Sequence, residues 1–352
     1  MNTTNSTIEN SIAEQDRLKS IAIWLKNHRP RSRLLGLASY IAVITTLLTL
    51  GTQGGCGANN SAPKDAGSGI VDGAPRDGGT HITATLIAGN FIGPESAQWD
   101  PLKQLWYVSN FGQNIDLTGG TADQPGYISK IAADGTVLDE RFVEMPGDFV
   151  GMAVAGDTLY VSHVTELLAV NTSTAAVTTI PVANASFLND VTESNGTVYI
   201  SDSVTNVIYR YQAGMAKADI FSRDPALVAP NGLQTTDNGQ LIAATIGAFP
   251  PNPATPGALF KLDSQGVATR LGQLSGIFDG VETLDGDLIV SDFGGKIYRV
   301  DSTGTETLVV NLSVAPNSLM SAADIGINPD NRSMLIPDLA GNRAYFVTLP
   351  AK

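Results

Sequence analysis

The sequence contains a single cysteine, Cys56, so the chain can form no internal disulfide bond. It is also poor in positive charge, with 21 lysine and arginine residues against 34 aspartate and glutamate residues and a net charge of −13. Residues 1–56 carry six basic and three acidic groups, which leaves the remainder of the chain with a net charge of −16. Because so acidic a body repels phosphate backbones, we exclude nucleic-acid binding.

The chain beyond residue 80 lacks the long helical segments that an α/β enzyme requires for its crossovers. It is instead rich in glycine, with 36 residues, and short apolar runs alternate with turns such as SNG and DGD. This pattern predicts many short strands joined by tight turns. The length of 352 residues allows one large domain or two of ordinary size.

The one long apolar run lies near the N-terminus. Residues 34–50 carry no charge and follow the basic stretch RPRSR at 29–33. A helix of this length spans about 26 Å, close to the roughly 30 Å of a bilayer core. Basic residues before the run predict that the N-terminus stays inside while the remainder is exported. We interpret the run as an export signal or an uncleaved anchor, and a core helix is the remaining alternative.

Cys56 follows this run in the stretch GTQGGCG. The stretch resembles a bacterial lipoprotein signal, in which the cysteine is lipidated and becomes the mature N-terminus, although Gln53 departs from the usual aliphatic residue. We predict a leader at residues 1–56, a flexible linker at 57–80 and the folded domain at 81–352. The domain is then expected on the cell envelope, attached to the membrane and facing the periplasm or the exterior.

Six similar segments repeat between residues 81 and 352. Each begins with a short strand led by a small or polar pair, followed by a tight turn, a strongly apolar strand and, in most cases, two further strands. The lead positions fall at residues 95, 150, 189, 231, 279 and 323. Four short antiparallel strands at a period near 45 residues are typical of a β-propeller blade. We therefore predict an all-β, six-bladed propeller closed by a strand at 83–89, with an all-β sandwich as the alternative.

The first strand of every propeller blade lines the central channel, so residues at its entry converge on one axis. The lead positions hold Glu95, Val150, Asn189, Asn231, Asp279 and Ala323, and the next positions hold Ser96, Gly151, Asp190, Gly232, Gly280 and Asp324. The second strand runs antiparallel to the first, so its end lies on the same face. Those ends carry Asn110, His163, Asp202, Thr245, Asp292 and Asp338. These columns define the candidate site.

Four oxygen-bearing side chains share the lead column. Glu95 and Asp279 would repel each other by about 4 kcal/mol at 4 Å and an effective dielectric of 20, so either one carboxylate binds a proton or a cation lies between them. Oxygens from Glu95, Asn189, Asn231 and Asp279 suit one hard divalent cation such as Ca²⁺, with Zn²⁺ or Mn²⁺ as alternatives.

The remaining polar positions have a second interpretation. Asp and Asn at strand ends commonly cap loops through backbone amides, which competes with a ligand-binding role for Asn110, Asp202, Asp292 and Asp338. Asp190 and Asp324 are open to both interpretations. His163 is either a hydrogen-bonded residue at the rim or a catalytic group.

Five short motifs occur in order along the chain, namely PESAQWD, FLNDV, APNGL, FDGVE and AADIGI. Over roughly residues 90–349 the chain resembles the family that includes gluconolactonase, senescence marker protein and luciferin-regenerating enzyme, in particular a bacterial exported branch. The resemblance implies that Glu95, Asn231 and Asp279 hold the metal and that Asn189 lies near the metal or the substrate. It also implies that Asp279 activates water for attack on a lactone carbonyl. The arginine that often holds sugar acids in that family has no equivalent here.

These observations predict a metal-dependent hydrolase of a lactone or related ester, acting as a monomer on a small molecule. A carboxylate bound to metal is a weak base, so His163 or Asp190 could accept the proton in place of Asp279. Asn110, Asp202, Asp292 and Asp324 are the predicted substrate contacts. A non-catalytic, metal-containing binding propeller and a structural propeller without metal are the alternatives, because fold alone does not imply activity.

Overall fold

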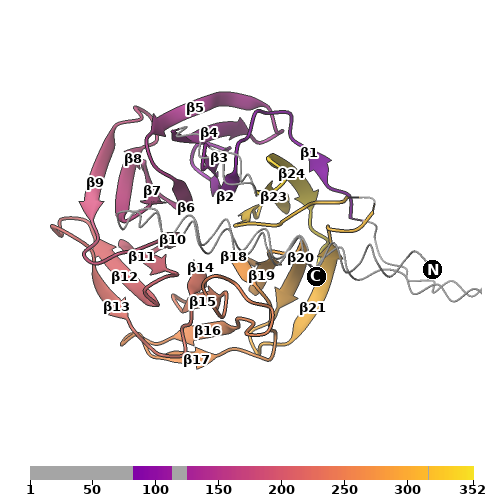
Figure 1. Ribbon diagram of the computed structural model, residues 1–352. Coiled ribbons are helices and arrows are strands. Elements are labelled where there is room, and N and C mark those ends of the chain that lie inside the picture. Colours follow the sequence, from indigo (N-terminus) through magenta and orange to yellow (C-terminus); the bar gives the residue numbers. More distant parts are fainter. Residues whose placement is uncertain (1–81, 113–124, 316) are drawn as a thin grey trace, which may run out of the picture. The chain divides into compact units, whose positions relative to one another are not determined.

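The structure is a computed structural model that describes residues 82–112, 125–315 and 317–352. Within these ranges the chain forms strands β1–β24, arranged as six four-stranded antiparallel sheets around a ring (Figure 1). The predicted six-bladed propeller is confirmed. The predicted leader, Cys56 and the linker lie outside the described residues and stay predictions. In the part of the chain that is described, no helix has the length and apolar character needed to cross a bilayer.

The first five blades follow chain order, with the first strand of each nearest the centre of the ring (Figure 1). Blades 1 and 2 consist of β2 (Pro94–Asp100), β3 (Leu105–Asn110), β4 (Gly126–Ala132), β5 (Val137–Met145), β6 (Phe149–Ala155), β7 (Thr158–His163), β8 (Glu166–Asn171) and β9 (Val177–Pro181). Blades 3 and 4 consist of β10 (Leu188–Ser194), β11 (Thr197–Asp202), β12 (Val207–Gln212), β13 (Asp219–Ser222), β14 (Pro230–Thr235), β15 (Leu241–Thr245), β16 (Leu259–Leu262) and β17 (Ala268–Arg270). Blade 5 consists of β18 (Phe278–Leu284), β19 (Asp287–Asp292), β20 (Lys296–Val300) and β21 (Glu306–Asn311).

The sixth blade combines the two ends of the domain. It consists of β22 (Gly326–Asn328), β23 (Ser333–Asp338), β24 (Arg343–Thr348) and, as its outer strand, β1 (Thr85–Leu86). Thr85 pairs with Phe346 in antiparallel register, and the amide of Ile87 donates to the carbonyl of Ala344 at 2.9 Å. β1 therefore covers the free edge of β24 and closes the ring, as the sequence predicted.

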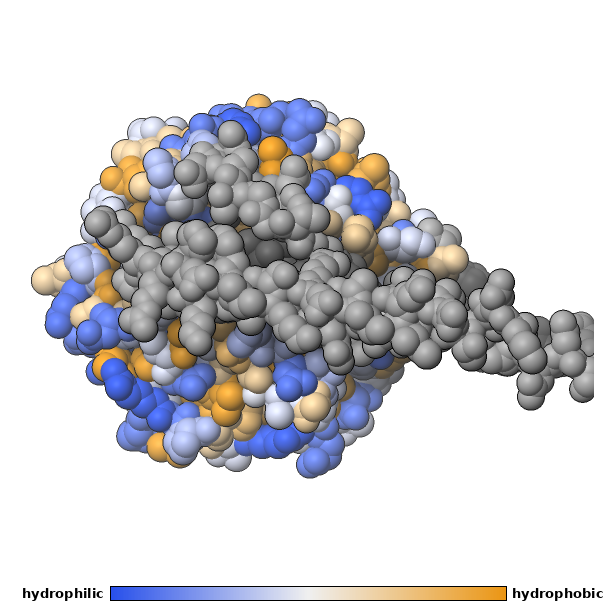
Figure 2. Space-filling model, viewed as in Figure 1, coloured by the Kyte–Doolittle hydropathy of each residue, from blue (hydrophilic) through white to orange (hydrophobic). Residues whose placement is uncertain are grey.

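The hydrophobic core lies between neighbouring blades, and the second strands contribute several of its fully buried side chains. In β19, for example, Ile289 and Val290 are fully buried. Ile289 packs in one cluster with Ile336 of the next blade, while Val290 packs in another with Ile242 of the preceding blade. Side chains that alternate along one strand thus face opposite neighbours, which explains why adjacent positions in the middle of these strands are both apolar. On the face shown in Figure 2, hydrophilic and hydrophobic residues are interspersed around the rim.

A β-bulge occurs at the lead pair of the first five blades. The register between first and second strands shifts in the segments 94–97, 149–152, 188–191, 230–233 and 278–281. A bulge leaves residues outside the ladder and re-aims their side chains. Serines of the second strand bind several of the released amides: the N–H groups of Ser96, Asp190 and Gly280 donate to Ser109, Ser201 and Ser291 at 2.8–2.9 Å.

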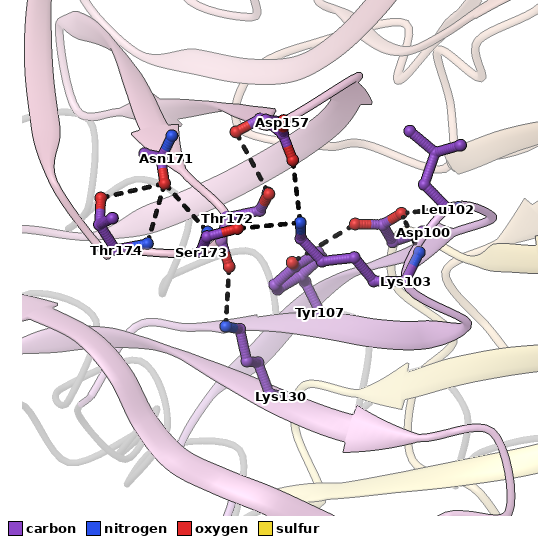
Figure 3. Close-up of polar contacts among 10 residues, drawn as sticks. All are labelled: Asp100, Leu102, Lys103, Tyr107, Lys130, Asp157, Asn171, Thr172, Ser173 and Thr174. Atoms are coloured by element: carbon purple, nitrogen blue, oxygen red, sulfur yellow. Dashed lines mark hydrogen bonds and ion pairs between the residues drawn. The ribbon is translucent and has the colours of Figure 1, made fainter.

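A polar seam joins blade 1 to blade 2 (Figure 3). Lys130 on β4 donates to the carbonyl of Thr172 at 2.9 Å, and its ammonium lies 3.4 Å from the centroid of the Phe142 ring. Lys103 donates to the exposed hydroxyl of Ser173 in the same loop at 3.1 Å and to Asp157, whose side chain is 74% exposed, at 3.0 Å. The two lysines therefore differ in how far water competes with their contacts.

We expect Lys130→Met to lower the free energy of unfolding by about 1–2 kcal/mol, because the variant loses a carbonyl hydrogen bond and a cation–π contact. Lys103→Met is the matched control and should cost less than about 1 kcal/mol, since exposed ion pairs contribute little. Denaturant unfolding of the full-length chain measures both values. Equal losses would contradict the view that Lys130 holds the seam.

Candidate functional site

The four predicted metal ligands stand at the entries of inner strands in blades 1, 3, 4 and 5. Their residue exposures are 1% for Glu95, 1% for Asn189, 3% for Asn231 and 2% for Asp279. The registers support the shared face, because Pro94 pairs with Asn110, Leu188 with Asp202 and Phe278 with Asp292. The polar lead positions and the ends of the second strands therefore lie at the same mouth of the channel.

Asn231 and Asp279 are in direct contact. The amide nitrogen Nδ2 of Asn231 donates to Asp279 Oδ1 at 2.8 Å and to the carbonyl of Phe278 at 3.2 Å. Both partners are acceptors, so they fix the orientation of the amide group. Within the described residues no hydrogen bond reaches Asn231 Oδ1 or Asp279 Oδ2. These two oxygens remain available for another ligand.

Asn189 is oriented in the same way by a serine. Its Nδ2 donates to Ser203 Oγ at 3.0 Å, and Ser203 donates its own hydroxyl proton to the carbonyl of Pro230 at 2.8 Å. Since that hydroxyl can only accept from Asn189, the amide nitrogen must face it. Asn189 Oδ1 receives no hydrogen bond in the described part of the chain. Ser203 was not identified from the sequence, where it stands one residue beyond the column of strand ends.

Neither carboxylate oxygen of Glu95 accepts a hydrogen bond from the described residues. Both Oε1 and Oε2 are buried and have no hydrogen-bond partner among the described residues. Burial raises the pKa of Glu95 well above its usual value, and the negative charges of Asp279, Asp324 and Asp190 raise it further. Burying a carboxylate without a partner costs several kcal/mol. Either a proton or a cation is required to remove that cost.

Asp190 and Asp324 hold adjacent inner strands together. The oxygens of Asp190 accept from the amides of Val191 and Leu233, each at 2.6 Å, which connects blade 3 to blade 4. Asp324 accepts from the hydroxyl of Ser96 at 2.6 Å, which connects blade 6 to blade 1. Burial raises the pKa of Asp190, and it raises the pKa of Asp324 to about 7. Asp190 and Asp324 lie in the same electrostatic network as Glu95.

The glycines beside the lead residues permit close approach of the next blade rather than leaving open space. A Cβ on Gly280 would lie 2.6 Å from Asp324 Oδ1, and one on Gly232 would overlap the carbonyl oxygen of Asp279. The inner strands can therefore converge only where these positions lack a side chain.

A second polar layer lies three residues beyond the lead positions. Thr192 donates to Gln234 at 3.4 Å, and Gln234 Nε2 donates to Glu282 Oε2 at 2.6 Å. These side chains, together with Asp190 and Asp324, line a channel cavity of about 110 Å³. Burial and the charge of Asp324 raise the pKa of Glu282 to about 8. Thr192, Gln234 and Glu282 were not identified from the sequence, where each is a polar residue three positions after a lead residue.

The strand-end residues make loop contacts. Asp202 accepts from four backbone amides, those of Ser186, Phe187, Val204 and Thr205. Asp292 accepts from the amides of Ile277 and Gly294, and Asn110 Oδ1 accepts from the amide of Ile92. These contacts favour the capping interpretation over the predicted contact with substrate.

The contacts of His163 do not include the predicted metal ligands. Its ring meets the edge of Phe149 at a centroid distance of 5.1 Å and packs against Gly147. Its Nε2 is buried and has no hydrogen-bond partner among the described residues. Burial lowers the pKa of His163, while the charge of Glu166 raises it. No contact in the described structure joins this histidine to Glu95, Asn231 or Asp279.

The lead column offers only oxygen donors from its side chains. In the described ranges no group of three or more His, Cys, Asp or Glu side chains has the arrangement of a metal site. The lead column instead combines two carboxylates with two amides whose oxygens face no other donor. Oxygen-only ligand sets of this kind are typical of Ca²⁺.

Comparisons with known proteins agree on the fold. No protein-family model matches the sequence, and a search of curated proteins found no match. Solved structures with a similar fold include a gluconolactonase from Xanthomonas campestris, with 14% identity over 75% of this chain and 88% of that one and a TM-score of 0.57. A luciferin-regenerating enzyme is 14% identical over 76% of this chain and 95% of that one, with a TM-score of 0.55. A streptogramin B lyase is 11% identical over 77% and 98%, with a TM-score of 0.54. At these identities the likeness shows the propeller fold alone, so any activity must be argued from the site itself.

Proposed function

We propose that this chain is a divalent-cation-dependent hydrolase of a lactone or related ester, with its centre at the mouth of the propeller channel. The observation that supports it most is the carboxylate of Glu95, which is 1% exposed with both oxygens unpartnered. A fold built only for stability would gain by removing this group. The likeness to gluconolactonase and luciferin-regenerating enzyme structures agrees with the proposal at the level of the fold.

The ligand set in this proposal is Glu95, Asn189, Asn231 and Asp279, and the cation is Ca²⁺. The donor atoms fit that ion, because the hydrogen bonds of Asn189 and Asn231 occupy their nitrogens and leave their oxygens for the cation. Bound there, the cation would polarise a substrate carbonyl and stabilise the oxyanion that develops on it.

The side chains of the channel mouth supply orientation and a proton acceptor. Asn231 holds Asp279 through Oδ1, so Oδ2 is the atom that would both face the cation and accept a proton from the attacking water beside it. Asp190 has both oxygens committed to the backbone amides of Val191 and Leu233, which suits it to holding blade 3 against blade 4 rather than to proton transfer. His163 contacts none of these groups, so Asp279 is the base in this proposal.

The test combines metal analysis with turnover. Mass spectrometry of the purified full-length chain should find one divalent cation per chain, and the chain should open members of a lactone panel until a chelator removes the ion. Restoration by Ca²⁺ is expected. One bound ion without turnover of any lactone would favour the binding module, and absence of a stoichiometric ion would overturn the proposal.

A further inference from the structure

The hydroxyl of Ser203 connects two of the proposed ligands. It accepts from Nδ2 of Asn189 at 3.0 Å and donates to the carbonyl of Pro230 at 2.8 Å, and Pro230 directly precedes Asn231. Asn189 and Ser203 are each only 1% exposed, so bulk water does not compete for these bonds. The ligands of blades 3 and 4 are therefore joined through one buried hydroxyl group.

The two amide ligands differ in the number of partners that hold them. Asn231 Nδ2 has two acceptors, which are the carbonyl of Phe278 at 3.2 Å and Asp279 Oδ1 at 2.8 Å. Among the described residues, Asn189 Nδ2 has Ser203 alone. Removal of this one hydroxyl would therefore leave nothing to determine which end of the Asn189 amide faces the channel, whereas Asn231 depends on no single partner.

The loop around Ser203 fixes the position of its hydroxyl. The amide of Ser203 donates to the carbonyl of Phe187 at 3.1 Å, which ties the loop to the segment that enters β10. The neighbouring Asp202 accepts from four backbone amides, two in that segment and two in the loop itself. The backbone that carries Ser203 is thus held on both sides, so its side chain is a rigid support for Asn189.

We propose that Ser203 is a positioning residue, which keeps Oδ1 of Asn189 turned toward the channel and thereby sets the affinity for Ca²⁺. This assignment rests on the cation site of the proposed function. Without the hydroxyl, the amide nitrogen would have no acceptor behind it, and the unpaired carboxylate oxygens of Glu95 and Asp279 would attract it instead. Ca²⁺ would then have to reverse the amide and leave its nitrogen buried and unpaired, which weakens binding.

Calorimetry of Ca²⁺ binding to the full-length chain tests this role without any turnover. Ser203→Ala should raise the Kd for Ca²⁺ about tenfold. Asn189→Asp replaces the amide by a carboxylate, whose two oxygens are equivalent and need no orientation. In the Asn189→Asp background the same serine substitution should change the Kd less than twofold. The difference between the two backgrounds reports on amide orientation, because a general loss of packing would appear in both.

Ser222→Ala is the matched control. Ser222 lies on the outer strand of the same blade and is 3% exposed, and its hydroxyl donates to the carbonyl of Gly266 at 2.6 Å and accepts from the amide of Asp224 at 3.2 Å. The control should lower the free energy of unfolding of the metal-free chain about as much as Ser203→Ala does, and it should leave the Kd within twofold. Ser203→Cys, with nearly the same volume and a weakly hydrogen-bonding thiol, replaces Ser203→Ala if that variant does not fold.

The outcomes separate this assignment from the hydrolase proposal. Equal losses of affinity in both backgrounds, or no loss in either, would overturn the role of Ser203 and leave the hydrolase proposal intact. If the substitution weakens Ca²⁺ binding only in the parent background, yet no lactone is opened, the role of Ser203 stands and the hydrolase proposal fails. A parent chain that binds no Ca²⁺ overturns both.

Discussion

Glu95→Gln is expected to stabilise the metal-free chain at pH 8 and to abolish its stabilisation by Ca²⁺. Glu95 is buried without a hydrogen-bond partner, and the charges of Asp279, Asp324 and Asp190 oppose its ionisation. Glutamine has nearly the same shape and carries no charge at any pH. The substitution therefore removes the repulsion in the metal-free chain and, in the same step, removes a ligand of the proposed cation site.

The direction of the pH dependence follows from the raised pKa values. In the folded metal-free chain, burial and the charge of Asp324 raise the pKa of Asp279 to about 8, and burial raises the pKa of Asp324 to about 7, against about 4 for an aspartate in the unfolded chain. Between about pH 4 and pH 8 the folded state then binds more protons than the unfolded state. The stabilisation contributed by these protons is therefore fully present below about pH 4 and is lost as the pH rises toward 8. A divalent cation replaces those protons. Its stabilising effect should consequently be larger at pH 8 than at pH 5.

Thermal unfolding of the full-length chain at pH 5 and pH 8, with chelator or with Ca²⁺, measures these effects. Ca²⁺ at about 100 times its dissociation constant should raise the Tm of the parent chain at pH 8 by about 5–10 °C and leave that of Glu95→Gln unchanged. Glu306→Gln, on the exposed outer strand β21, is the matched control and should respond to Ca²⁺ as the parent does. A variant that is less stable than the parent without metal, yet equally stabilised by Ca²⁺, would remove Glu95 from the proposed site.

The arrangement of the site was predictable where it followed from the repeat. The spacing of lead residues predicted that the inner strands that carry Glu95 and Asp279, far apart in sequence, would begin at the same end of the channel. The closing strand β1 was predictable because the last repeat lacked a fourth strand. Both predictions needed only the number of strands per repeat and the direction of each, which the alternation of turns and apolar runs determines.

The roles of individual polar residues were harder to predict, because they depend on which backbone amides are left unpaired nearby. Asp202 and Asp292 bind the amides of the segments that lead into β10 and β18. Asp324 stands in the second column and yet reaches Ser96 across the junction between the first and last blades. These contacts depend on the bulges and on the small tilt of each strand, which a sequence pattern does not contain.

The second polar layer left a sequence signal that we could have used. Gln234 and Glu282 each stand three residues after a lead position, where a continuous apolar strand would carry a hydrophobic residue. A polar residue there indicates a position that faces the channel rather than the core between blades.

Asp279→Asn is expected to lower kcat/KM for the best lactone by at least about a thousandfold, which is within the range for loss of a general base. Asparagine has nearly the same size as aspartate and can still accept the hydrogen bond from Asn231. It provides no carboxylate oxygen at the Oδ2 position to accept a proton. Lower metal affinity would also reduce turnover, so the variant is assayed at Ca²⁺ concentrations that saturate it, with the bound ion counted by mass spectrometry. Loss of turnover with the ion in place then reports on proton transfer.

His163→Gln separates the two candidate bases. Because His163 packs against Phe149 and Gly147 and contacts none of the lead residues, its replacement should change kcat/KM less than about threefold and should leave the pH profile unmoved. If instead His163→Gln abolished turnover with the ion bound while Asp279→Asn retained most of it, the histidine would be the base and Asp279 only a ligand. The contrast is informative because both residues end or begin strands at the same mouth, yet only Asp279 has an unpartnered oxygen beside the free oxygen of Asn231.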